Sequence, residues 1–113
     1  MPDTWNWVGA TGRSYSYKIF ELPVSFGRRQ FGNYVLAKHG TGGRWHPVYV
    51  GEGDLAKRIS PDHYEAHCIE QKGATHVHVH LNSDEHDRRG ELRDVLTRNV
   101  EAYEPSGCND PLA

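Results

Sequence analysis

Two short β-type runs joined by a glycine-rich segment constrain the fold of this chain most. Residues 31–38 and 45–51 are rich in aromatic and β-branched side chains, and the segment between them, 39–44, holds three glycines. A connection of that length predicts a β-hairpin with a long tip in place of a tight two-residue turn. The two strands carry Tyr34 and Tyr49, so we expect the hairpin to set two phenols side by side.

The rest of the chain alternates strand and helix signals. Residues 74–81 alternate histidine with valine or leucine, which predicts a strand with its histidines on one face. The other expected elements are a strand over 14–22, a short helix capped by Asp54, a helix over 61–72 and a long helix over 84–103. This order predicts an α+β fold: a small, mostly antiparallel sheet with a three-stranded core and an extra N-terminal strand, flanked by helices. We expect one domain over 14–110, preceded by an N-terminal arm over 1–13.

Charge is distributed unevenly along a chain of 113 residues with a net charge of −2. Residues 1–60 hold eight Lys/Arg against four Asp/Glu, whereas residues 61–113 hold five against eleven. The N-terminal half could therefore face a polyanion. The alternative is a solvated surface on which the charges cluster by chance.

The cysteine content and the first residues bear on the compartment. Cys68 and Cys108 are the two cysteines, too few for a disulfide framework or a cysteine-based zinc site. The start lacks a basic region followed by a long apolar run, so we expect no signal peptide and no membrane span. A reduced, cytoplasmic setting is the default expectation.

Several short motifs occur in one order along the chain. They are Gly32-Asn33-Tyr34, Tyr49-Val50-Gly51, Arg58 in DLAKR, His63 or His67 soon after it, Glu91 in RRGELRDVL, and Asn109 after Pro105. Together they resemble the signature of the GIY-YIG nuclease family, and the matches extend from about Tyr15 to Asn109. The resemblance implies a divalent-metal-dependent endonuclease that hydrolyses phosphodiester bonds in DNA.

The resemblance also implies roles for the matched residues. Glu91 would bind Mg²⁺, for which Mn²⁺ could substitute, and the ion would offset charge that develops on phosphorus. Arg58 would donate two hydrogen bonds to the non-bridging phosphate oxygens. Asn109 is expected to hold the C-terminal loop near the site.

Two residue types compete for the role of base. Tyr34 is the base by analogy, with Tyr49 positioning the water or the phosphate, but an ordinary phenol has a pKa of about 10 and needs nearby cations to ionise. His67 or His63 needs no such tuning. Candidate contacts to DNA are Lys38, Arg28, Arg29 and Arg44.

Two other functions compete with the nuclease. His76, His78 and His80 share one strand face, so they could bind a transition metal, and the protein would then be a metal-binding module or a metal hydrolase. A catalytically silent relative that binds nucleic acid is the other alternative.

Overall fold

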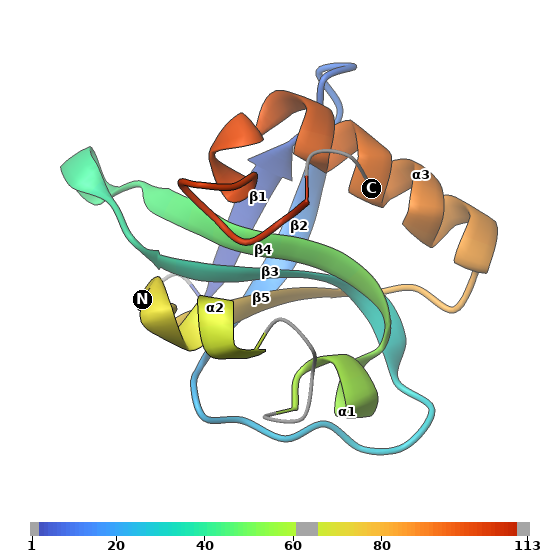
Figure 1. Ribbon diagram of the computed structural model, residues 1–113. Coiled ribbons are helices and arrows are strands. Elements are labelled where there is room, and N and C mark those ends of the chain that lie inside the picture. Colours follow the sequence, from blue (N-terminus) through green and yellow to red (C-terminus); the bar gives the residue numbers. More distant parts are fainter. Residues whose placement is uncertain (1–2, 61–65, 111–113) are drawn as a thin grey trace.

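The computed structural model describes residues 3–60 and 66–110, which form an α+β fold around one five-stranded antiparallel sheet (Figure 1). The strands follow the order β1-β2-β5-β3-β4 across the sheet. The strands are β1 (Thr4–Val8), β2 (Ser14–Glu21), β3 (Phe31–His39), β4 (Trp45–Asp54) and β5 (His76–Leu81). The α-helices are α1 (Leu55–Arg58), α2 (Ala66–Gln71) and α3 (Glu85–Arg98). The two 3₁₀ turns are η1 (Thr41–Gly43) and η2 (Val100–Ala102).

The predicted fold class is confirmed in its coarse form, but the strand count differs. Residues 4–8, which the sequence analysis assigned to an N-terminal arm, pair along their whole length with β2. Trp7 of this strand is only 4% exposed and belongs to the core. A five-residue run flanked by polar residues and glycine carries too weak an alternation to be distinguished from a loop by its sequence.

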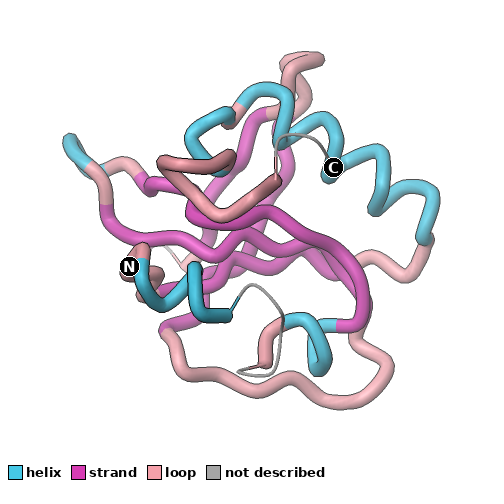
Figure 2. Tube along the Cα trace, in the orientation of Figure 1, coloured by secondary structure: helices cyan, strands magenta, loops and turns pink. Residues whose placement is uncertain are grey.

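The two faces of the sheet carry different layers. α3 packs on the face that carries Tyr17 and Val35, whereas the opposite face, with Tyr34 and Leu36, belongs to a second cluster that Ile59 and Ile69 help to cover. Figure 2 shows the long helix on one side of the curled strands and the two shorter helices on the other. The side chains of β3 and β5 alternate between these layers, as the sequence predicts for β5.

Helix ends follow the local chemistry. The Asp54 side chain accepts a hydrogen bond from the Ala56 N–H at 3.1 Å, and the Asp84 side chain accepts one from the Asp87 N–H at 2.9 Å. Both carboxylates therefore cap a helix, as expected at Asp54. The long helix ends at Arg98, earlier than predicted, because Asn99 leaves helical geometry and its amide donates to Val8 O and Val95 O. The predicted start of the helix over 61–72 lies outside the described residues, and α2 covers its second half.

The expectation of two reduced cysteines is wrong. Cys68 on α2 and Cys108 in the C-terminal loop form a disulfide across 40 residues of sequence. Their sequence spacing gave no hint of the pairing, because it depends on how the C-terminal loop returns to the sheet. The bond joins α2 to the loop that carries Asn109.

His78 is buried in the sheet face that packs against α3. The Trp7 indole N–H donates to its Nδ1 at 2.9 Å, so the proton of the neutral ring is on Nε2, which has no hydrogen-bond partner within the described residues. Burial lowers the pKa of His78 to about 4, with smaller contributions from His76 and His39.

This shift predicts loss of stability in mild acid. The unfolded chain binds a proton at His78 near pH 6.5 and the folded chain only near pH 4, so the stabilising contribution is complete above pH 6.5 and falls as the pH drops toward 4. The loss amounts to about 3 kcal/mol. Urea unfolding of wild type and His78→Gln between pH 7 and 4 should show the steeper decline in wild type. Parallel pH profiles would contradict this.

Candidate active-site groove

The two motif tyrosines lie together in the structure. Tyr34 on β3 and Tyr49 on β4 are both buried, and their rings stack with centroids 6.2 Å apart and planes inclined by 30°. Tyr34 pairs directly with Gly51, so Tyr49 is its diagonal neighbour across the two strands. The hairpin therefore brings the phenols side by side, as the sequence predicts.

Each motif glycine has a steric reason. A β-carbon at Gly51 would fall on the Tyr34 hydroxyl, so the absence of a side chain there is what lets the Tyr34 ring lie across β4. A β-carbon at Gly32 would collide with the backbone carbonyl of His80 on β5. Gly51 is therefore required by the close approach of the Tyr34 ring, and Gly32 by the close approach of β5.

Arg58 ends α1, immediately after β4. The capping of this helix by Asp54 fixes the direction in which the chain leaves the sheet. Gly53 has φ of +133°, and a β-carbon there would lie 3.2 Å from Arg58 Nε, so the arginine side chain crosses this glycine. The side chain is exposed and borders the tyrosine pair.

Asn109 connects the C-terminal loop to β4. Its Nδ2 donates to Val50 O at 2.9 Å, and its Oδ1 accepts from Val50 N at 2.8 Å. The Cys108 N–H donates to Val48 O at 2.7 Å. The side chain and the loop thus bind the outer edge of β4, which is the role expected for Asn109.

These four residues line one groove along the edge of β4, with a volume of about 280 Å³. Tyr34, Tyr49, Arg58 and Asn109 come from separate elements spread over 75 positions of the chain. Two carboxylates also border the groove, those of Glu52 and Asp110, which the sequence analysis did not single out. Glu52 Oε1 also accepts a hydrogen bond from Arg88 Nε at 2.9 Å.

Glu91 does not lie in this groove. Glu91 lies on α3, is 5% exposed and faces the sheet. There it accepts hydrogen bonds from the Tyr17 hydroxyl at 2.5 Å and from His80 Nδ1 at 2.9 Å. Burial, together with the Glu91 charge, raises the pKa of Tyr17 well above its usual value, so Tyr17 remains a donor. The sequence placed Glu91 at the margin of the buried stripe, and the structure places it inside.

The candidate DNA contacts divide between the two ends of the hairpin. Leu55 N bonds Gln30 O, so Arg28 and Arg29 lie in the loop that reaches the Arg58 end. Arg44 lies at the hairpin tip, roughly 25 Å away along β3. Lys38 is half-buried and donates to the Lys72 carbonyl at 2.9 Å.

Of the two histidines that could act as the base, the described residues include one. His67 is exposed on α2 and borders a second, more apolar pocket that also contacts Arg58. His63 lies outside the described residues.

The three strand histidines are held by different hydrogen-bond and ring partners. His76 and His78 both contact the Trp45 ring, His78 also accepts from the Trp7 indole N–H, and His80 binds Glu91. Within residues 3–60 and 66–110, no group of three or more His, Cys, Asp or Glu is placed to hold a metal ion.

Comparison with known proteins found no match among family models, curated proteins or solved structures. The resemblance to GIY-YIG nucleases therefore stays a prediction. None of the helices in the described ranges is long and apolar enough to cross a membrane.

Proposed function

We propose that this protein is a divalent-metal-dependent endonuclease that hydrolyses phosphodiester bonds in DNA at the β4 groove. The observation that supports it is the convergence of Tyr34, Tyr49, Arg58 and Asn109 on one groove. All four belong to the sequence motifs that resemble the family signature. Their meeting in space is what a common active site requires.

Each residue has a physical task in this proposal. Arg58 is exposed at the mouth of the groove, where a guanidinium can donate to two non-bridging phosphate oxygens. The stacked phenols of Tyr34 and Tyr49 orient the attacking water, and Tyr34 or a histidine, His67 or His63, accepts its proton. Asn109 holds the loop that closes one side of the groove.

A divalent ion would supply charge compensation for the phosphate, with Mg²⁺ or Mn²⁺ as the proposed cofactor. Mg²⁺ commonly takes one or two protein carboxylates and keeps several waters. The carboxylates that border this groove are those of Glu52, which also accepts from Arg88 Nε, and Asp110. Glu91 does not line this groove, and both of its oxygens accept hydrogen bonds on the α3 face of the sheet.

Nicking of supercoiled plasmid tests the function and the carboxylate assignment together. Wild type should nick and relax the plasmid in the presence of Mg²⁺ or Mn²⁺, and the reaction should stop when EDTA is added. Glu52→Gln and Asp110→Asn should each require more metal for the same rate, whereas Glu91→Gln should not. Thermal unfolding of each variant serves as the control for folding.

Two outcomes would contradict this proposal. Loss of nicking in Glu91→Gln alone, in a folded variant, would return the metal to Glu91. DNA binding with no cleavage by wild type across several metals would instead identify a catalytically silent nucleic-acid-binding protein.

A further inference from the structure

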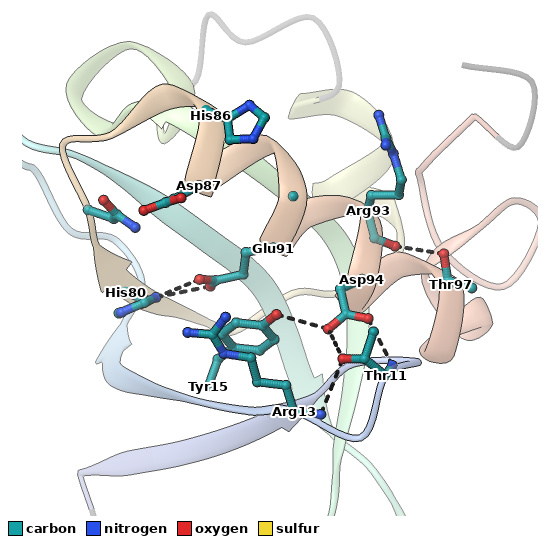
Figure 3. A pocket seen from close by; sticks show the side chains of 12 residues that line it. Thr11, Arg13, Tyr15, His80, His86, Asp87, Glu91, Arg93, Asp94 and Thr97 are labelled. Carbon is teal, nitrogen blue, oxygen red and sulfur yellow. Dashed lines mark hydrogen bonds and ion pairs between the residues drawn. The ribbon is translucent and has the colours of Figure 1, made fainter.

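A separate pocket lies between the turn after β1, the end of β5 and α3, on the α3 face of the sheet (Figure 3). Its volume is about 560 Å³, larger than the β4 groove. Polar and charged side chains line it, among them Arg13, His80, Asp87, Glu91 and Arg93. None of these residues belongs to the groove.

A buried hydrogen-bond chain ends in this pocket. The Tyr17 hydroxyl donates to Glu91 Oε2 at 2.5 Å, and both carboxylate oxygens lie within 3.0 Å of His80 Nδ1. A carboxylate can only accept, so His80 Nδ1 is the donor in this contact, and in the neutral form of the ring the lone pair is then on Nε2. Within the described residues Nε2 makes no hydrogen bond, and the His80 side chain is 34% exposed.

This arrangement has the form of a general-base pair. A buried carboxylate that binds one ring nitrogen fixes the tautomer and the ring orientation, and it stabilises the imidazolium that forms when the other nitrogen takes a proton. Tyr17 holds the carboxylate in turn. His80 is thus oriented by Glu91, and Tyr17 fixes the position of Glu91.

Two arginines in the pocket lining, Arg13 and Arg93, can bind an anion near His80. Asp94 is already occupied, because it accepts from Thr11 N, Thr11 Oγ1 and the Tyr15 hydroxyl. Arg13 and Arg93 form no ion pair within the described part of the chain. The Arg13 guanidinium lies 5.2 Å from the Tyr15 ring centroid and points toward His80 and Glu91 in Figure 3.

A doubly charged ligand fits this pocket less well. Asp87, Glu91 and Asp94 contribute three carboxylates to the lining against two guanidinium groups. A monoanion held by Arg13 adds one negative charge beside these carboxylates, whereas a dianion adds two.

We propose that this pocket is a second hydrolytic site, specific for small monoanionic phosphodiesters, with His80 Nε2 as the general base and Arg13 as the anchor of the phosphate. Water attacks phosphorus while Nε2 takes one of its protons, and a new P–O bond forms. The P–O bond to the leaving group breaks, the leaving oxygen departs with the electron pair, and the imidazolium returns the proton to it. The step balances without a metal ion, and it does not depend on the function proposed for the groove.

Hydrolysis of bis(4-nitrophenyl) phosphate by the full chain in excess EDTA tests this inference. EDTA removes the metal ion on which hydrolysis at the groove would depend. Because 4-nitrophenolate is a good leaving group, a general base that activates water is enough for hydrolysis without a metal ion. Wild type should release 4-nitrophenol catalytically, and His80→Asn should lower kcat about 10²-fold or more. His39→Asn, at an exposed histidine outside the pocket, should have the wild-type rate.

The roles of the neighbouring residues separate in the kinetic constants. Arg13→Gln should raise KM with a smaller change in kcat, because it removes the anchor. Glu91→Gln should lower kcat with KM unchanged, because it alters the basicity and tautomer of His80 and leaves the anchor in place. If Glu91 served structure alone, Glu91→Gln would change the unfolding temperature but would not lower kcat selectively over KM.

Two results would overturn the proposal. One is the absence of EDTA-resistant hydrolysis by folded wild type. The other is an unchanged kcat in folded His80→Asn. Loss of plasmid nicking in EDTA, with hydrolysis of the small diester retained, would show that the two sites act separately.

Discussion

Replacement of Arg58 by leucine is expected to lower the rate of plasmid nicking about 10²–10³-fold, the usual cost of removing one preorganised donor to a developing charge. In the proposed function Arg58 would provide that donor, since its side chain crosses Gly53 next to the tyrosine pair in the groove. Arg58→Lys should recover only part of the rate, because an ammonium retains the charge but loses the paired donors. Single-turnover nicking at saturating protein measures the effect on the chemical step.

Lys57 offers the matched control for this experiment. It is the preceding residue on the same short helix, it is exposed, and it does not line the groove. Lys57→Ala removes one positive charge and should leave nicking within a few-fold of wild type. Equal losses in the Lys57 and Arg58 variants would reduce the role of Arg58 to general attraction of DNA.

Removal of the Cys68–Cys108 disulfide is expected to cost about 4 kcal/mol of unfolding free energy, because the bond closes a loop of 40 residues in the unfolded chain. The double variant Cys68→Ala, Cys108→Ala should unfold at a lower urea concentration than oxidised wild type. Wild type in reductant is the matched control, since it lacks the bond but retains both side chains, of which that of Cys108 is fully buried.

The same experiment has a functional arm. Cys108 is adjacent to Asn109, whose side chain binds β4 at the groove. If reduction leaves the urea midpoint of wild type unchanged, the bond does not constrain the chain as the structure indicates. Nicking by the reduced protein then reports whether the hydrogen bonds to Val50 hold the loop by themselves.

Local patterns in the sequence were enough to predict much of the architecture. The alternation over 74–81 predicted both the strand and the division of its side chains between two faces. Asp54 predicted a helix start because its carboxylate can cap the first turn. The hairpin predicted that Tyr34 and Tyr49 would meet, since their register follows from pairing two adjacent strands.

Long-range placement could not be predicted in the same way. Whether Glu91 faces the groove or the opposite layer depends on which face of the sheet receives α3, and no local pattern encodes that choice. The contact of His80 with Glu91 and the disulfide depend on the same tertiary packing. Asn33 shows the limit for a single side chain: it is fully buried in β3, and its amide donates to the Arg88 carbonyl of α3.

The loop that carries Asn109 also covers part of an outer strand edge of the sheet. β4 is an outermost strand of the sheet, and an exposed strand edge is a template on which other chains can pair. The Asn109 amide and the Cys108 N–H occupy backbone groups of Val48 and Val50, where a foreign strand would have to bond. The residue matched to a nuclease motif therefore also closes an aggregation-prone edge, and selection on solubility would preserve it even in a chain that never cut DNA.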